Sequence, residues 1–398
     1  MITVHSHSDA PPRASRRTSL ILGVLVGIIG VAVAVGAALT WPTNLSTLGS
    51  EQLIDDDAAW VIADVVSVHE LTGEITVDIA TDGESVRDTV QPSGVPGMLF
   101  DAGDKIRVLQ LPDGSMVFSD FDRTQPMLLL LAVYVLAVLL VARWRGAGAL
   151  LGLGIAFGIV VFYAVPSLLD GNNPVVVGLV TGAGSLFALL YIAHGINART
   201  TTAYLGTIAG LAVTALIGVW AVAAANIPGV PSDAELSLVY VNGNVELRGL
   251  ALCGLMLAGL GILNDVTVTQ ASAAWELRAA RPDLSRYELF KRTMRIGRDH
   301  IASTVYTFAF AYVGASLPLI MIVLLYDEGA ETAVTSSEVA GEIVRTLVGS
   351  IGLVLAVPLT TAIAALVVGS RAVQPQHDEV LIDEPFDHDA PVAPGERR

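Results

Sequence analysis

Long uncharged apolar segments constrain this chain more than any other feature. Eight runs are long enough to cross the roughly 30 Å hydrocarbon layer of a membrane as helices of about 20 residues. Because lipid offers no hydrogen bonds, such segments are expected to be helices. The runs are Leu20–Leu39, Pro126–Ala142, Ala147–Leu169, Pro174–Ala193, Thr202–Ala225, Leu247–Ala274, Ile301–Tyr326 and Ile343–Gly369. We therefore predict a membrane α-helical bundle of about eight transmembrane helices.

Residues 41–125 form the one sizeable polar segment between these runs, and they predict a small all-β domain. Five short stretches have strand character, and Pro112-Asp113-Gly114 is typical of a hairpin turn. The predicted strands are Trp60–His69, Glu74–Thr81, Glu84–Gln91, Lys105–Leu111 and Ser115–Phe121. Five short strands with glycine-rich joints favour an OB-like barrel. Although OB folds often bind oligonucleotides, this segment has 16 acidic residues, and the chain has a net charge of −16, which excludes nucleic acid as a partner.

Basic residues predict the orientation in the membrane, because Lys and Arg gather on the cytoplasmic side. With a cytoplasmic N terminus and alternating crossings, 16 of the 22 basic residues lie inside, including all seven between Arg278 and Arg298. We therefore expect a bacterial plasma-membrane protein with both termini cytoplasmic and the β domain outside.

The remaining boundaries follow from composition. Residues 1–18 predict a disordered tail, residues 19–40 a first transmembrane helix, and residues 126–370 a seven-helix domain. Residues 371–398 predict a disordered acidic tail. The first helix is an uncleaved signal anchor or a cleaved signal peptide, and the length of its apolar run favours the anchor.

Metal and cysteine chemistry has little support in the sequence. His5-Ser-His7 and Asp55-Asp56-Asp57 have ligand types for a cation, but a tail and a solvated linker explain them as well. The single cysteine, Cys253, lies in an apolar run and is expected to be a buried apolar side chain. We predict no cofactor, and the sequence leaves a metal open.

The stretch from Leu260 to His300 contains the charge that is energetically least favourable in a membrane, the carboxylate of Asp265. Asn264-Asp265 interrupts an apolar run, and a carboxylate at this depth costs about 2.5–3.5 kcal/mol or more against lipid. Four polar residues recur at helical spacing and share one face: Asp265, Thr269, Ser272 and Glu276. Asp265 could coordinate a cation with Asn264, Thr269 and backbone carbonyls, relay a proton, or bond to another helix as a structural contact. We expect Thr269, Gln270 and Ser272 to line the same helix face as Asp265.

Candidate partners of this stripe lie on other segments. His194 ends one apolar run, where it could carry a proton or cap a helix. Arg298, Asp299 and His300 lie at the start of another run. Pro166, Pro318 and Pro358 predict kinks that free backbone carbonyls.

A basic amphipathic helix is predicted at about 283–299. Ser285 and Glu288 fit a capping box. Leu284, Tyr287, Phe290 and Met294 repeat at helical spacing opposite the basic residues. We expect this helix to lie on the inner membrane surface among anionic headgroups, with docking to a cytoplasmic partner as the alternative.

Three motifs resemble the bacterial YibE/F family of multi-span membrane proteins. They are the sequence from Asn264-Asp265 to Trp275-Glu276-Leu277, then Met294-Arg-Ile-Gly-Arg298-Asp299-His300, and then Phe310-Ala-Tyr-Val-Gly-Ala-Ser-Leu-Pro318. Gly103-Asp104-Lys105-Ile106 is similar to a signature of the family's extracytoplasmic segment. The resemblance marks Asp265, Gln270, Glu276, Gly297, Arg298 and Asp299 as motif positions. Asn264 departs from the usual small or apolar residue. The resemblance implies architecture and location and leaves the activity open.

Two functions fit the sequence. The first is a permease that moves an ion or small solute along a path involving Asp265, as a single chain or a homo-oligomer. The second is a non-transporting envelope protein whose outer β domain binds a cell-wall component or a partner protein. We expect no enzyme, since no phosphate loop, metalloprotease motif or nucleophile elbow occurs, and a membrane enzyme would require His194 or His300 in catalysis.

Overall fold

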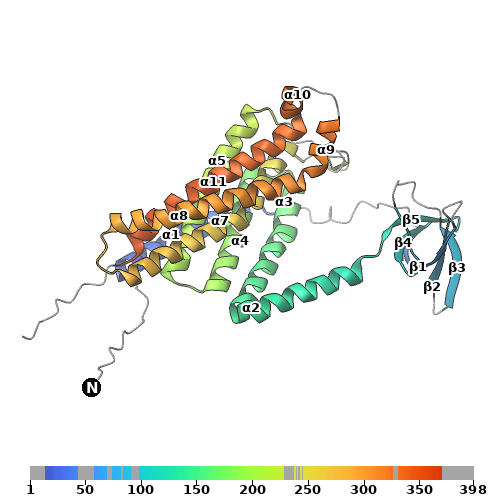
Figure 1. The fold of residues 1–398 in the computed structure, drawn as a ribbon, viewed down its shortest axis with the longest axis horizontal. Helices are drawn as coiled ribbons and strands as arrows, with labels where there is room; N and C mark the ends of the chain where they lie inside the picture. The colour runs from blue at the N-terminus through green and yellow to red at the C-terminus, as the bar shows by residue number, and fades with distance from the viewer. Residues whose placement is uncertain are drawn as a thin grey trace, which may run out of the picture.

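A small β-sheet and a helical bundle, joined by the long helix α2, make up the protein (Figure 1). The computed structural model describes residues 14–43, 58–69, 74–81, 84–90, 98–227, 237–238, 240, 243, 245–325 and 330–369. The predicted acidic tail, His5, His7 and Asp55–Asp57 lie outside the described residues.

The sheet consists of five antiparallel strands that agree with the predicted ones to within one residue at each end. They are β1 (Ala59–Val68), β2 (Ile75–Thr81), β3 (Glu84–Val90), β4 (Lys105–Gln110) and β5 (Met116–Phe121). The order is β3-β2-β1-β4-β5, and alternate side chains form a buried core that includes Val65, Ile106 and Phe118. Because the described pairings leave β3 and β5 as edges, the closed OB-like barrel stays a prediction.

The predicted hairpin turn joins β4 to β5. Leu111 and Ser115 pair across it, and the Asp113 carboxylate accepts a hydrogen bond from the Ser115 amide. Gly114 has a φ of 84°, a conformation that glycine adopts without steric cost.

The helices enclose a core built around α7. Their bounds are α1 (Arg16–Leu39), α2 (Thr124–Ile159), a π-helical turn η2 (Val160–Ala164), α3 (Val165–Leu169), α4 (Pro174–His194), α5 (Ala198–Ala224), α7 (Leu247–Ala280), α8 (Arg286–Ala315), α9 (Leu317–Leu325), α10 (Ala330–Thr335) and α11 (Ser337–Val367). In the part of the chain that the structure describes, six helices are long and apolar enough to cross a membrane, with Thr124–Leu169 counted as one. Helices α8 and α9 make a seventh if that bent pair is one span.

The count of eight spans is not confirmed, and the difference lies in α2. By length and composition, the 46-residue stretch Thr124–Leu169 counts as one candidate span. It is broken at Arg143, whose φ of 54° and ψ of −132° are not helical. The ribbon turns sharply there, so that two arms meet at the bend (Figure 1). The predicted spans Pro126–Ala142 and Ala147–Leu169 correspond to these arms.

Two of the three predicted proline positions coincide with irregular backbone. Pro166 lies in α3, two residues after Ala164, the last residue of the π-helical turn η2. Pro318 lies just after the 62° bend between α8 and α9. Pro358, in contrast, lies inside the uninterrupted helix α11.

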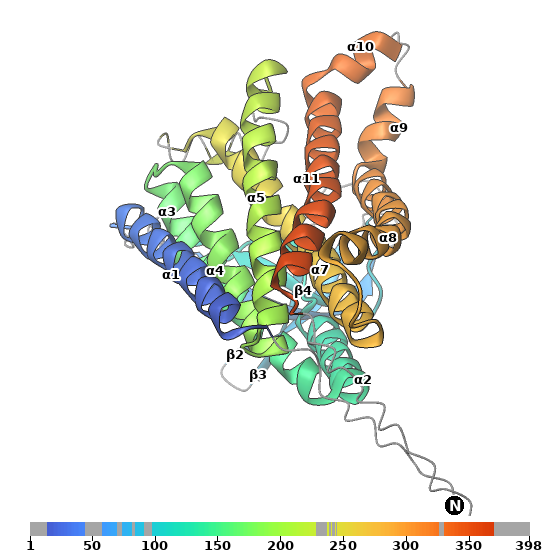
Figure 2. The ribbon, with the colours of Figure 1, turned by 90° about the vertical axis from the view of Figure 1, so that its left-hand side faces the viewer.

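Close approach of helices through small residues holds the bundle together. Figure 2 shows α5, α7 and α11 side by side. Gly206 on α5 faces Thr360 of α11, and Gly210 faces Ala356, so that any side chain at these glycines would collide with α11.

The C-terminal end of α1 packs on this bundle. Thr40 shares a hydrogen bond of 2.5 Å with the Tyr163 hydroxyl, and Ser167 donates to the Thr40 carbonyl at 2.6 Å. Its apolar residues Val33 and Ala37 pack with Val177 and Val180 of α4. Whether this helix is an uncleaved anchor stays a prediction.

Replacing Gly36 should therefore loosen α1. A Cβ at Gly36 would lie 2.6 Å from Val180 Cγ2, so Gly36→Val should destabilise the protein by about 1–3 kcal/mol through overpacking. Thermal unfolding in detergent measures the change. The matched control is Gly30→Val on the same helix, where an added Cβ meets no atom within 4 Å. Equal loss in both variants would contradict the packing described above.

Candidate functional site

Helix α7 has two different faces. One face packs into the bundle and includes the fully buried Val266, Ala271 and Ala274. The predicted polar stripe lies on the opposite face: Asp265 and Glu276 are exposed, and Thr269 and Ser272 are half-buried. The four residues therefore share one face, as their spacing predicts.

The open face extends beyond the polar stripe toward the start of α7. Gly254, Ala258 and Gly261 lie one or two turns apart on this face and are all exposed. An added Cβ at Gly254 or Gly261 would meet no other atom within 4 Å. The face is thus lined by small residues in its first half and by polar residues in its second half.

Asp265 meets a histidine at the edge of this face. Its Oδ2 lies 3.9 Å from Nε2 of His300 on α8, and the Asp265 side chain is 71% exposed. The His300 nitrogen is buried and has no hydrogen-bond partner within the described part of the chain. The Thr304 hydroxyl donates to the His300 carbonyl and helps to fix this turn of α8. A protonated His300 would make an ion pair with Asp265.

Gln270 and Asn264 do not lie on the open face. Gln270 is fully buried, and its Oε1 accepts a hydrogen bond of 3.0 Å from the Thr361 hydroxyl of α11. Gly297 of α8 lies directly against it. Asn264 is half-buried, with an Oδ1 that is buried and unbonded among the described residues. The expectation that Gln270 lines the same face as Asp265 is therefore wrong, and the reason is that it stands about 140° around the helix.

A buried pair of threonines connects α7 to α5, and sequence reasoning missed it. Thr207 and Thr267 share a hydrogen bond of 2.6 Å, and Thr207 also donates to the Ala203 carbonyl. Interhelical hydroxyl bonds of this kind are typical of membrane bundles. The only signal in the sequence is the repeated threonine in both apolar runs.

The other predicted partners are spread over separate places. His194 is the last residue of α4, and Asn197 caps α5 by accepting from the Thr200 amide. Arg298 and Asp299 are exposed on α8, on the side away from the core. Only His300 is brought next to Asp265.

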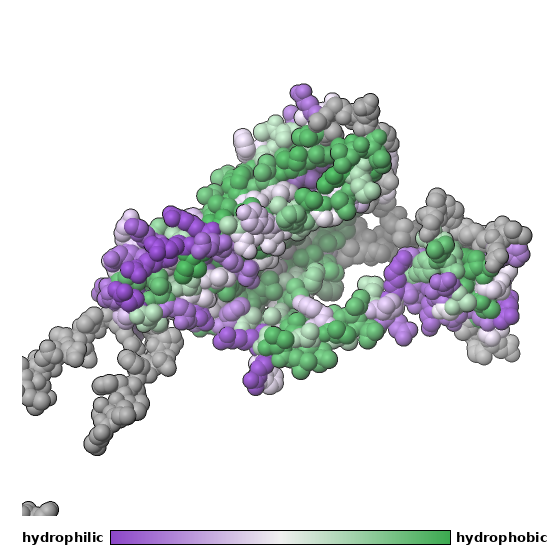
Figure 3. Space-filling view, in the orientation of Figure 1, coloured by the Kyte–Doolittle hydropathy of each residue, from purple (hydrophilic) through white to green (hydrophobic). Residues whose placement is uncertain are grey.

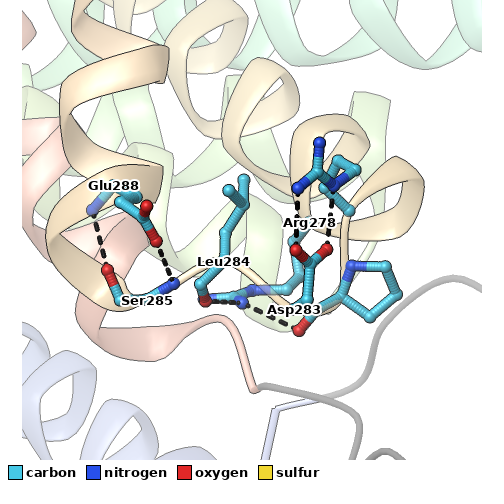
Figure 4. Close-up of polar contacts among 7 residues, drawn as sticks. Arg278, Asp283, Leu284, Ser285 and Glu288 are labelled. Atoms are coloured by element: carbon cyan, nitrogen blue, oxygen red, sulfur yellow. Dashed lines mark hydrogen bonds and ion pairs between the residues drawn. The ribbon is translucent and has the colours of Figure 1, made fainter.

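A compact turn joins α7 to α8 (Figure 4). Arg278 is buried, and its Nη1 donates to the carbonyls of Pro282 at 3.2 Å and Leu284 at 2.5 Å. The predicted capping box is confirmed, since Ser285 and Glu288 bond reciprocally.

The Arg281 guanidinium lies on the exposed side of this turn. It donates two hydrogen bonds to Asp283 and lowers the pKa of that carboxyl to about 2. The folded-state pKa lies below its usual value, so this pair is lost only as the pH falls toward 2.

The predicted amphipathic helix is the first half of α8. The helix runs from Arg286 to Ala315 without a break into its apolar half. Leu284 and Leu289 are buried against Trp275 of α7 and Val367 of α11, whereas Tyr287 is 73% exposed. This apolar face therefore packs mainly on protein, and the hydrophilic end of the molecule in Figure 3 includes its other face.

Arg278 should be essential for the turn. Arg278→Met would remove this donor from the buried Leu284 carbonyl and the part-buried Pro282 carbonyl, which should cost about 2–4 kcal/mol. Thermal unfolding and hydrogen exchange at residues 278–289 measure this loss. Arg281→Met is the control. The Arg281 side chain is half-exposed and bonds only to Asp283 within the described chain, so its effect should be much smaller. A larger effect at Arg281 would refute the role of Arg278.

Comparison with known proteins gives one match. A family model described as "YibE/F-like protein" matches residues 130–370, which is well over half of the chain. No curated protein and no solved structure matches.

Proposed function

The chain belongs to the YibE/F-like family, and on this premise we propose that it is a bacterial plasma-membrane permease that moves an ion or small solute along the open face of α7. One observation carries the proposal: the Asp265 carboxylate is largely exposed on a span-length helix. A charge in contact with lipid would cost several kcal/mol, so this face requires water, a solute or protein against it.

The chemistry of the face supports a path. Gly254, Ala258 and Gly261 leave room beside the helix, while Asp265 and Thr269 offer oxygen atoms to a hydrated cation or a polar solute. If α7 enters the hydrocarbon layer a few residues after Leu247, Asp265, about 27 Å along the helix from Leu247, lies in the inner half of a layer about 30 Å thick. A solute would therefore pass the small residues and meet the carboxylate near the cytoplasm.

Asp265 and His300 together supply a site for a proton or a cation. The Asp265 carboxylate and the His300 imidazole can each bind a proton, and Oδ2 of Asp265 lies 3.9 Å from Nε2 of His300. We propose that the pair alternates between an ion pair and a state in which Asp265 binds the transported ion.

The orientation is part of the same proposal. We infer that both termini are cytoplasmic, that the sheet is extracytoplasmic, and that the two arms of α2 cross the membrane separately, which gives eight spans. Support comes from Arg143 and Arg145 at the bend of α2 and from the basic residues at the α7–α8 turn. The strand order and the proximity of β3 to β5 support an OB-like sheet.

Cysteine accessibility tests whether the face meets water. In a Cys253→Ala background, Thr269→Cys and Ser272→Cys should react with a water-soluble maleimide at least about tenfold faster than Ala271→Cys, which is on the buried face of the same helix. Mass spectrometry of protein in vesicles measures the labelling. If all three cysteines stay unlabelled from both sides, the face is covered by protein or lipid and the path is excluded.

Removing the charge of Asp265 tests transport. Proton flux into proteoliposomes, followed with a trapped pH-sensitive dye, should fall at least about tenfold in Asp265→Asn, because the amide cannot exchange a proton. Glu276→Gln, which changes an exposed carboxylate of the same stripe nearer the end of the helix, should keep most of the flux. If folded Asp265→Asn protein has an unchanged proton flux, the proposal that Asp265 transfers protons is wrong. If the fluxes of other cations are unchanged as well, the proposed transport path through Asp265 is wrong.

The second candidate is an envelope protein that binds through its sheet. Trp60 and Ile62 of β1 and Val117 of β5 are exposed on the side of the sheet away from its core. Exposed apolar groups of this size favour a binding surface for a cell-wall component or a partner protein. Deleting residues 50–122 discriminates: this candidate requires loss of cellular function on deletion and no effect of Asp265→Asn.

A further inference from the structure

The first half of α8 carries an unpaired basic surface. Four of its side chains are exposed on the side opposite the buried Leu289, Thr293 and Gly297. We call this the basic surface, and it consists of Lys291, Arg292, Arg295 and Arg298. Within the described part of the chain, none of these four forms an ion pair, and the acidic residues Glu288 and Asp299 on α8 do not balance them.

The described chain ends beside this surface. The last turn of α11 packs against the start of α8, where Val367 and Val368 share a core with Leu284 and Leu289. Both views show the end of α11 next to α8 and the α7–α8 turn (Figures 1 and 2). The described chain therefore ends beside the start of α8, on the side of that helix opposite the basic surface.

The sequence that follows is complementary in charge. Residues 378–389 contain six carboxylates and no lysine or arginine. The acidic residues are Asp378, Glu379, Asp383, Glu384, Asp387 and Asp389. Val380, Leu381, Ile382 and Phe386 stand between them and could cover the exposed ring of Tyr287.

The length of chain permits the contact. Nine residues separate Gly369 from Glu379, which span up to about 30 Å when extended. A helix with its side chains is about 10–12 Å across, so the acidic residues can reach around α8 without strain.

We propose that residues 378–389 dock on the basic surface of α8 as an intramolecular ligand. The contact joins the end of α11 to the α7–α8 turn, next to the helices that carry Asp265 and His300. Because its charges are exposed, each pair contributes little alone, and the docking is reversible and weakened by salt. Anionic lipid headgroups have the same chemistry as the acidic segment and compete with it for the basic surface.

Crosslinking in the full chain tests the docking. In a Cys253→Ala background, Tyr287→Cys and Ile382→Cys are joined by a short bis-maleimide in nanodiscs of phosphatidylcholine, which has no net charge. The comparison variant carries Asp378→Asn, Glu379→Gln, Asp383→Asn, Glu384→Gln, Asp387→Asn and Asp389→Asn. We expect the yield of crosslink to fall at least about fivefold in this variant and to fall similarly in about 0.5 M salt. Yields within twofold of one another would overturn the proposal.

Two further experiments identify what occupies the basic surface. Replacing the basic surface (Lys291→Gln, Arg292→Gln, Arg295→Gln and Arg298→Gln) should lower the yield as far, whereas the control Arg143→Gln with Arg145→Gln at the bend of α2 should leave it unchanged. Equal losses in both sets would show a general charge effect and overturn the proposal. In nanodiscs of phosphatidylglycerol, the chain with its acidic residues intact should keep at least half of the crosslink yield that it gives in phosphatidylcholine. A fall to the yield of the variant without these acidic residues would mean that lipid headgroups occupy the basic surface instead. Thermal unfolding of each variant, which should be unchanged, separates loss of docking from loss of fold.

Discussion

Close contact between helix backbones is the constraint on which the bundle depends. Lipid provides no hydrophobic force between helices, so association relies on packing and on bonds between polar groups. Gly206 and Gly210 let α5 approach α11, and Gly297 lets α8 approach Gln270 of α7. The same approach makes the buried hydroxyls useful, because Thr207 and Thr361 can then reach partners on α7. One face of α7 is thereby packed against three helices, α5, α8 and α11, and the opposite face remains open.

This division explains which functional residues could be predicted from the sequence. The polar stripe repeats with a helical period, which can be read from the sequence alone. It consists of Asp265, Thr269, Ser272 and Glu276. The five strands and the Ser285–Glu288 capping box depend on local signals as well, and the structure agrees with them. Each of these features is decided within about a dozen residues.

The remaining features are decided by tertiary contacts. Gln270 is five residues from Asp265 and looks like part of the same polar stretch, yet its partner Thr361 lies 91 residues away. Arg278 looks like one more cytoplasmic charge, but the turn after it folds back and supplies two carbonyls. Leu284 and Leu289 have the pattern of a surface helix, and only the end of α11 shows that protein covers them. Local periodicity predicts on which face of its helix a residue lies. Which side chain from another helix it contacts depends on how the helices pack together.

The attachment of the sheet has a mechanical consequence. Strand β5 ends at Phe121, and α2 starts at Thr124, so only two residues separate the sheet from a helical arm that reaches Arg143. That arm is about 28 Å long and has no buried residue before the bend at Arg143. The second arm, in contrast, is held against α4 through Gly148 and Gly152. Within the described part of the chain, the direction in which the sheet is held is therefore set by the backbone at Arg143 and not by side-chain packing along the first arm.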